Sequence, residues 1–358
     1  MAVTEQPTPL DEDKLGAFMN QAVGELGATV GAALVVIGDK LGLYKALAKA
    51  GPLTSAQLAE STGTAERYVR EWANAQAAGG YLTYDPAARA YAIPPEQAAV
   101  LADDSSPFFM AGAFQAFTSL VRDEPKIREA FKSGAGVGWH EHHHDLFEGT
   151  ERFFRTGYAT HLVSEWIPAL EGVEDKLRSG ARVADVGCGL GASTIIMAKA
   201  FPASQFVGFD YHKESIEAAR ERAREAGVTD RVRFEVAPAS GLTGTYDLVC
   251  MFDCLHDMGD PVGAARQVLA ALEKDGTWMI VEPFAGDAIE DNLNPVGRVY
   301  YGASTLVCTP ASLSQEVGLG LGAQAGEARL RDVVTAGGLT RFRRATETPF
   351  NIVLEARP

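Results

Sequence analysis

The sequence has few cysteines and no long uninterrupted apolar run. Four cysteines occur in 358 residues, and none forms a C-x-x-C pair, so we expect reduced thiols. No stretch of about 18 residues is free of polar side chains, and we therefore expect no membrane-spanning helix. The polar start MAVTEQPTPLDEDK lacks the basic segment and apolar core of a signal peptide. Together these absences predict a cytoplasmic protein.

Positive charge is also scarce. The chain has 47 acidic against 32 basic residues and a formal net charge of −15. Such a field repels a long phosphate backbone on average but tolerates a small cationic ligand. We therefore expect a small-molecule partner and no nucleic acid. A length of 358 residues with 46% hydrophobic and 22% charged residues is typical of a globular chain with two domains.

The first part of the chain has helical and winged-helix character. Residues 1–14 are predicted to be a disordered tail, and residues 15–95 a helical and winged-helix domain. Within it, residues 15–50 are helical and rich in Ala and Gly, which favours close packing across a homodimer interface. Thr54 followed by Gln57 predicts a capping box at the start of the next helix. A second short helix and a hairpin turning at Asp85–Pro86 complete the winged-helix order.

The pattern changes twice more along the chain. Residues 96–178 are predicted to be a helical connector with a lid, interrupted by the segment SGAGVGWHEHHH. From residue 179 to residue 358, short apolar runs alternate with helical segments. Such alternation predicts an α/β fold, a parallel sheet with helices on both faces. The final runs LTRFRRATETPFNIVLEARP predict an antiparallel hairpin turning at Thr348–Pro349.

The segment VADVGCGLGAS joins a strand to a helix through three glycines. Glycine allows a sharp turn and a close approach of the backbone to a ligand at a helix N-terminus. Gly187, Gly189 and Ala192 also satisfy the dinucleotide fingerprint. Asp185 favours another ligand, because a carboxylate there suits an ammonium and a sulfonium better than a pyrophosphate. Asp210, 25 positions later, can accept ribose hydroxyls in either case.

With this loop and the final hairpin, residues 180–358 resemble the class I S-adenosylmethionine (SAM) methyltransferase fold. The whole chain resembles two-domain small-molecule O-methyltransferases. The resemblance implies a seven-stranded Rossmann-like sheet, SAM as cofactor, a dimerising winged-helix domain and methyl transfer to a small molecule. The sequence departs from the family where many relatives carry an Asp that binds the adenine amino group, because FEVAPASG offers only Ala237 and Ala239 there.

The resemblance also implies roles for particular residues. In MFDCLHDMGDP, His256 and Asp257 match the His–Asp pair of the family, so His256 is predicted to be the general base, aided by Asp257. Glu282 matches an acid that orients that base. Tyr158, His161, Tyr300 and Tyr301 are predicted to line the acceptor pocket. The predicted cofactor-binding residues are Asp185, Gly187, Cys188, Gly189, Gly191, Asp210, Tyr211, Ala237, Phe252 and Asp253.

Three alternatives remain open at this stage. The histidine cluster from His140 to His144 can belong to a lid, a solvated linker or, through the i, i+4 pair, a metal site, although we predict no metal. The winged helix raises the alternative of a DNA-binding regulator that senses SAM or another small ligand. The glycine loop leaves an NAD(P)-dependent oxidoreductase as a third interpretation.

Overall fold

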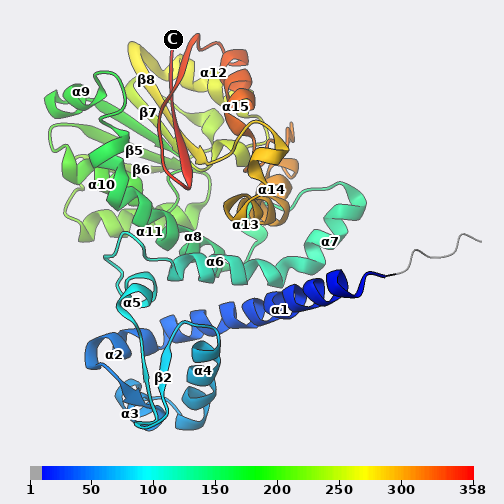
Figure 1. The fold of residues 1–358 in the computed structure, drawn as a ribbon. Coiled ribbons are helices and arrows are strands. Elements are labelled where there is room, and N and C mark those ends of the chain that lie inside the picture. The colour runs from blue at the N-terminus through cyan, green and yellow to red at the C-terminus, as the bar shows by residue number, and fades with distance from the viewer. Residues whose placement is uncertain (1–9) are drawn as a thin grey trace, which may run out of the picture. The chain divides into compact units, whose positions relative to one another are not determined.

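A computed structural model describes residues 10–358, which form two compact units that meet between residues 118 and 119 of the chain (Figure 1). Residues 1–9 of the predicted tail lie outside the described residues. The rest of that tail is ordered, which corrects the sequence prediction. The Asp11 side chain accepts a hydrogen bond from Lys14 N and begins the first helix, α1 (Glu12–Lys40).

The first unit contains the predicted winged helix. The capping box at Thr54 is confirmed, and β1, β3 and β2 form a three-stranded antiparallel sheet in that order. Both arginines of the fourth helix form ion pairs within it, Arg67 with Glu71 and Arg70 with Glu66. The elements are α1, α2 (Leu43–Ala50), β1 (Leu53–Thr54), α3 (Ser55–Thr62), α4 (Glu66–Ala78), β2 (Thr83–Asp85), β3 (Ala90–Ala92), α5 (Pro95–Leu101) and α6 (Ala111–Leu120).

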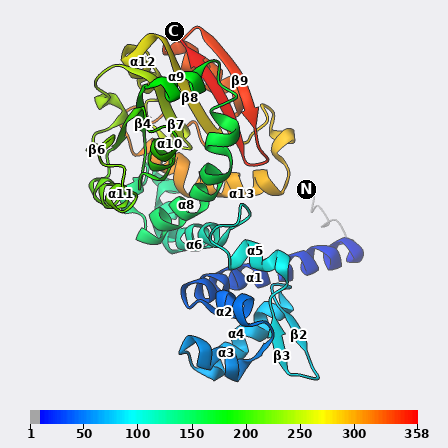
Figure 2. The same ribbon diagram turned by 90° about the vertical axis from the view of Figure 1, so that its left-hand side faces the viewer.

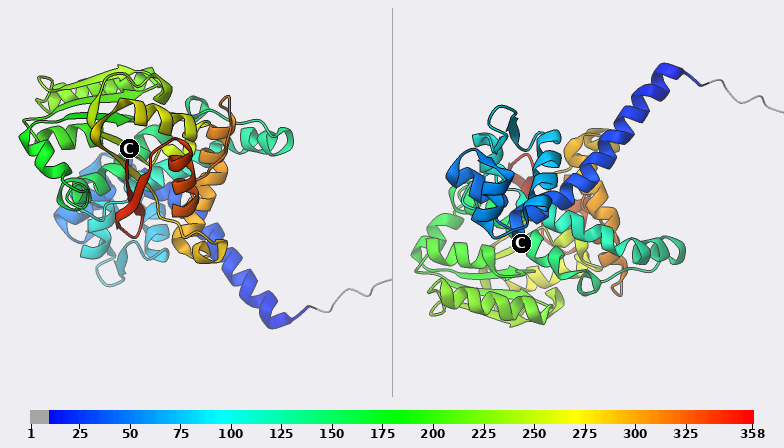
Figure 3. Two further views of the ribbon diagram at one scale, coloured as in Figure 1. Left: turned by 90° about the horizontal axis from the view of Figure 1, so that it is seen from above. Right: turned by 90° about the horizontal axis from the view of Figure 1, so that it is seen from below.

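Helix α1 carries an apolar face that its own unit leaves uncovered. The N-terminal half of the helix extends beyond the other elements of the unit (Figure 3). Phe18, Leu26 and Val30 are 64%, 70% and 63% exposed, at helical spacing along one side. By length and composition, α1 is also long and apolar enough to cross a membrane. The sequence prediction of no membrane-spanning helix considered only uninterrupted apolar runs and therefore missed this helix.

The second unit is built on a seven-stranded sheet in the order β6-β5-β4-β7-β8-β10-β9. Its first five strands are parallel, and β10 runs antiparallel to both β8 and β9. Figure 2 shows β6 and β9 at opposite edges. The predicted α/β class and terminal hairpin are confirmed. The strands are β4 (Arg182–Val186), β5 (Gln205–Asp210), β6 (Val232–Val236), β7 (Tyr246–Phe252), β8 (Leu272–Pro283), β9 (Arg341–Glu347) and β10 (Asn351–Arg357).

Helices cover both faces of this sheet, as a parallel sheet requires. One apolar core lies under α9, α10 and α11, and the other under α12 and α15 (Figure 1). The helices are α7 (Glu124–Ser133), α8 (His144–Gly157), α9 (Val173–Ser179), α10 (Ala192–Ala200), α11 (Lys213–Glu225), α12 (Pro261–Ala271), α13 (Pro295–Ala303), α14 (Thr309–Leu313) and α15 (Gly326–Ala336). Two π-helical segments, Tyr158–Trp166 and Ser304–Cys308, continue α8 and α13.

Candidate active site

A cavity of about 660 Å³ lies at the carboxyl ends of the parallel strands. Gly187, Asp210 and Phe252, at the ends of β4, β5 and β7, all line it. In open α/β sheets, ligands bind in the crevice outside these strand ends. Every lining residue falls between 138 and 315, within the second unit.

The glycines of the loop have different tasks. The backbone N–H groups of Gly187 and Cys188 donate to the Phe209 carbonyl, at 2.8 and 3.0 Å, which fixes the loop against β5. Gly189 lines the cavity with φ at 52°, and a Cβ built on it would meet no atom within 4 Å. Gly191 does not line the cavity. A Cβ there would lie 2.7 Å from the Phe234 ring, so this glycine serves the packing of α10.

Asp210 closes one end of the loop. Its Oδ2 accepts a hydrogen bond from Gly189 N at 2.9 Å and its Oδ1 one from His212 N at 2.8 Å. Burial raises the pKa of this carboxyl above its ordinary value. Asp210 lines the cavity, and a carboxylate oxygen that already accepts one hydrogen bond can accept another. The residue is therefore placed to receive hydroxyl groups of a ligand.

Asp185 takes a different position from the one that the sequence suggested. It is 1% exposed and does not line the cavity. Its Oδ2 accepts hydrogen bonds from the hydroxyls of Ser193 and Thr194, both at 2.6 Å, which fixes the first turn of α10. Burial raises the pKa of Asp185 to about 6. Oδ1 has no hydrogen-bond partner among the described residues. The carboxylate supports the loop from behind.

Asp253 occupies a strained position beside the glycine loop. Its φ is 50°, which is uncommon for a residue with a side chain and is often found at functional sites. Oδ1 accepts a hydrogen bond from Asn351 Nδ2 at 2.8 Å, whereas Oδ2 is buried and has no partner within residues 10–358. Burial, with Glu282 nearby, raises the pKa of Asp253 well above its ordinary value. Tyr158 lines the same part of the cavity, with its ring 5.2 Å from that of Phe252.

The remaining predicted cofactor residues also line the cavity. Ala237 follows β6, and its N–H donates to the Asp210 carbonyl at 2.9 Å. Its neighbours Pro238 to Ser240 continue this wall, with no carboxylate among them. Tyr211 is 51% exposed at the rim. Cys188 lies in the loop itself.

The predicted catalytic residues come together beside the cavity. His256 Nδ1 bonds to Glu282 Oε2, and Nε2 forms an ion pair with Asp257 Oδ1 at 3.1 Å. Glu282 Oε1 accepts a hydrogen bond from Leu255 N at 3.0 Å. Burial opposes a charge on His256, but the two carboxylates outweigh it and hold its pKa well above the ordinary value. The two carboxylates therefore favour the protonated form of His256.

Asp257, not His256, reaches the cavity. It lines the cavity although it is only 8% exposed, whereas His256 and Glu282 do not line it. Asp257 Oδ2 accepts a hydrogen bond from Trp139 Nε1 at 2.8 Å. Burial works against the charge of Asp257, but His256 and the Trp139 hydrogen bond outweigh it and lower the pKa of Asp257 below the ordinary value. The cluster thus presents one ionised carboxylate to the cavity.

Trp139 is a site residue that the sequence analysis missed. It lines the cavity, and its ring lies 5.6 Å from that of Phe147, edge to face. Phe147 in turn stacks on His212, with the centroids 4.7 Å apart. A lone Trp inside a Gly-rich segment was the available signal, because an aromatic side chain there must find a partner elsewhere.

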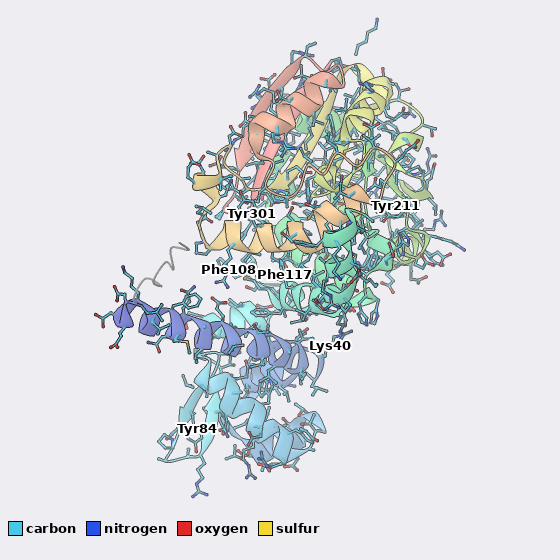
Figure 4. The ribbon with its side chains drawn as sticks, turned by 90° about the vertical axis from the view of Figure 1, so that its right-hand side faces the viewer. Lys40, Tyr84, Phe108, Phe117, Tyr211 and Tyr301 are labelled. Carbon is cyan, nitrogen blue, oxygen red and sulfur yellow. The ribbon has the colours of Figure 1, made fainter. Side chains whose placement is uncertain are left out.

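Three predicted acceptor residues do not line this cavity. Tyr300 is buried, and its hydroxyl donates to the Phe350 carbonyl at 2.7 Å. Tyr301 lines a second cavity of about 380 Å³, far from Tyr211 (Figure 4). His161 bonds to Glu165 Oε2 at 3.0 Å. Of the four predicted acceptor residues, Tyr158 lines the main cavity and the other three do not; an acceptor role for these three stays a prediction.

The histidine cluster is structured and divided. His140 lines the cavity, whereas the side chain of His142 is fully buried and its Nδ1 bonds to Asp123 at 2.8 Å. His140 belongs to the short helical turn Trp139–Glu141 and His144 begins α8, so the i, i+4 pairing on one helix is not formed. Ligand atoms of His143, His144 and Asp145 lie within 4.8 Å of one another, which is compatible with an ion.

Comparison with known proteins identifies the domains. Residues 177–315 match the methyltransferase domain family, and residues 29–103 match the Rv2258c-like winged HTH domain. The 27-O-demethylrifamycin SV methyltransferase of Amycolatopsis mediterranei is 34% identical over 131 residues, which is 34% of this chain and 48% of that protein. The chain spans about half the length of the curated relatives it matches.

Solved structures share the fold over almost the whole chain. The mitomycin 7-O-methyltransferase MmcR has a TM-score of 0.72 at 19% identity and covers 97% of this chain and 100% of its own. Human N-acetylserotonin methyltransferase, solved with SAM, has a TM-score of 0.68 at 16% identity over 100% and 99% of the two chains. The second unit thus contains a methyltransferase domain and has the fold of the class I methyltransferases. The chain combines this domain with an N-terminal winged HTH domain.

The residues of the cavity fit SAM. Gly189 leaves open space at the loop, and Asp210 offers acceptors for ribose hydroxyls. The unpartnered Oδ2 of Asp253 suits the methionine ammonium. The wall Ala237–Ser240 offers backbone and small side chains to the adenine. A cavity of about 660 Å³ has room for an acceptor as well.

Proposed function

We propose that this protein methylates a hydroxyl group of a small molecule. When bound, SAM supplies an activated methyl group. The loop residues Gly187 to Gly189 and Asp210 hold the cofactor, and Asp253 binds its ammonium group. This leaves Trp139, Asp257 and the residues around Ser314 as the acceptor end of the same cavity. The observation that carries the proposal is the ionised carboxylate of Asp257 at that end, supported from behind by His256 and Glu282.

We further propose that Asp257 contacts the acceptor hydroxyl. The sequence predicted His256 for this role, but both imidazole nitrogens face carboxylates and the ring does not line the cavity. A hydroxyl must lose its proton when its oxygen is methylated, and the Asp257 carboxylate takes that proton. A carboxylate is a sufficient base, because a methylated hydroxyl that still carries its proton is far more acidic than a carboxylic acid. His256 is then a positioning residue that keeps Asp257 ionised.

This division of roles has a direct test. Asp257→Asn should lower kcat for labelled methyl transfer to a panel of phenols by roughly 10²–10⁴-fold, while affinity for S-adenosylhomocysteine (SAH) is unchanged. His256→Gln should retain activity and move the acid limb of the pH profile upward, since Asp257 then loses the cation that lowers its pKa. Full turnover by Asp257→Asn would contradict this division and return the role of base to His256. So would a wild-type activity that rises between pH 6 and pH 8, if the His256→Gln variant no longer shows that rise.

We also propose that two copies of the chain cover the apolar face of α1. Leu26 and Val30 lie at the centre of this face and are 70% and 63% exposed. Exposed apolar patches of this kind mark interaction sites, and a second copy offers the same face in return. Leu26→Glu with Val30→Glu should convert a dimer into a folded monomer in sedimentation velocity. Thr29→Glu, on the same helix, is the matched control. A wild-type monomer, or one that binds lipid vesicles through α1, would contradict the proposal.

A further inference from the structure

Cys308 completes a buried group of three side chains that can each ligate a metal ion. It lies in the π-helical segment that continues α13, and its thiol donates a hydrogen bond to Asp257. Ligand atoms of His256, Asp257 and Cys308 all lie within 4.8 Å of one another. His256 Nε2 and Asp257 Oδ1 are 3.1 Å apart. In a tetrahedral zinc site, bonds of about 2.0–2.3 Å place neighbouring ligand atoms about 3.3–3.6 Å apart. Small movements of these side chains would therefore let all three share one ion.

The imidazole and the carboxylate of this group are each held from outside it. Glu282 Oε2 bonds to His256 Nδ1, which leaves Nε2 for an ion. Trp139 Nε1 donates a hydrogen bond to Asp257 Oδ2, which leaves Oδ1. A metal-binding histidine usually has such a carboxylate or carbonyl partner on its other nitrogen, and a ligating carboxylate is usually hydrogen-bonded in turn. The orientation that an ion requires is therefore already set.

The surroundings of the group favour a cation. Asp257 lines the main cavity, which gives an ion a path to the group and leaves a coordination position for water. Five carboxylates line this cavity, and no lysine or arginine does among the described residues. The other potential ligand group, His143, His144 and Asp145, is less favourable because Arg122 lies 2.6 Å from His143 Nε2.

We infer that His256, Asp257 and Cys308 bind Zn²⁺, a thiophilic divalent cation, and that the bound ion inhibits methyl transfer. A set of nitrogen, oxygen and thiolate ligands favours zinc over magnesium or calcium. Bonds form from the ion to Nε2, Oδ1 and Sγ, and the protons on the thiol and on Nε2 leave to water. Two positive charges enter the buried group as two leave, so its net charge is unchanged.

The inhibition rests on the proposed function, because that function assigns the Asp257 carboxylate to the acceptor hydroxyl. An ion on this carboxylate occupies the group that has to take the proton. The binding of the ion does not depend on that assignment, so binding and inhibition are tested separately.

Titration of the full chain, freed of metal by dialysis against a chelator, tests the site. Zn²⁺ should bind in calorimetry, and Co²⁺ should give the near-ultraviolet charge-transfer absorption of a cobalt–thiolate bond. Cys308→Ser keeps the volume and a donor to Asp257 but removes the thiolate. It should abolish this absorption and weaken Zn²⁺ binding at least roughly tenfold, while SAH affinity is retained.

Two controls locate the ion. Cys250→Ala changes a buried cysteine of β7 outside the group and should leave the cobalt absorption unchanged. His144→Ala removes a ligand of the other potential group and should leave it unchanged as well. A cobalt spectrum without the thiolate absorption, or an absorption that persists in Cys308→Ser, overturns the site.

Inhibition is measured by labelled methyl transfer to the phenols that the metal-free protein methylates. Stoichiometric Zn²⁺ should lower the wild-type rate at least roughly tenfold, whereas Cys308→Ser should lose much less of its own metal-free rate. Equal inhibition of the two proteins, or a wild-type rate that Zn²⁺ does not lower, overturns the inferred inhibition. If the metal-free protein methylates no phenol, the proposed function fails, while the cobalt spectrum still decides whether the site exists.

Discussion

The second and third glycines of the motif provide a matched pair for a stability and binding test. Gly189 and Gly191 both have positive φ, 52° and 80°, but their surroundings differ. A Cβ on Gly189 enters open cavity, whereas a Cβ on Gly191 meets the Phe234 ring at 2.7 Å and Ala219 Cβ at 2.9 Å. Substitution by alanine therefore adds the same backbone strain at both positions and steric overlap at only one.

The expected magnitudes follow from these contacts. Alanine in the left-handed region costs about 1–2 kcal/mol, which is the whole stability effect expected for Gly189→Ala. Overpacking a core adds about 1–3 kcal/mol, so Gly191→Ala should lose about 2–5 kcal/mol. Binding should show the reverse order. The methyl group that Gly189→Ala introduces would occupy space that the cofactor uses, and the affinity for SAH should fall at least roughly tenfold, about 1.4 kcal/mol.

Urea unfolding followed by tryptophan fluorescence measures the loss of stability in each variant. Trp166 and Trp278 are buried in the second unit, at 1% and 0% exposed, and report on its unfolding. Calorimetric titration of SAH measures the loss of cofactor affinity. If Gly189→Ala is the less stable variant, or if Gly191→Ala is the one that loses SAH affinity selectively, the assigned roles of the two glycines are wrong.

Two further predictions concern the buried cluster. Glu282→Gln removes one partner of a buried ion pair and should destabilise the protein by about 3 kcal/mol at neutral pH; the exposed Glu290→Gln should not. Because the folded pKa of His256 lies above its unfolded value of about 6.5, this contribution is complete below about pH 6.5 and is lost as pH rises through the folded pKa, so the deficit should shrink in alkaline urea titrations. Trp139→Phe keeps an aromatic ring but removes the hydrogen bond to Asp257. Because this hydrogen bond lowers the pKa of Asp257, the acid limb of the pH profile of kcat should move to higher pH. An acid limb at an unchanged pH would show that Trp139 does not affect the pKa of Asp257 in this way.

Much of the fold follows from local sequence. The capping box at Thr54 and the glycine loop that ends β4 are short-range patterns, and each is present in the structure. The alternation of strands and helices likewise predicted the class and the terminal hairpin. These features depend on backbone preferences and periodicity over a few residues.

The site was less predictable because its decisive contacts are long-range. The bond from Trp139 to Asp257 joins residues 118 positions apart. The glycines around Trp139, taken alone, predict a flexible segment. Neighbours on a helix also face different directions, so Tyr300 packs against the final hairpin while Tyr301 lines another cavity. Likewise, the adjacent residues His256 and Asp257 do not by themselves indicate which of the two side chains faces the cavity.

The most direct test of the central claim is calorimetric titration of the purified full chain with SAH and, separately, with NAD. We predict one SAH site per chain with no measurable binding of NAD, and a melting temperature that rises with SAH concentration. Binding of NAD in place of SAH, or a folded protein that binds neither, would contradict the assignment of the cavity to SAM.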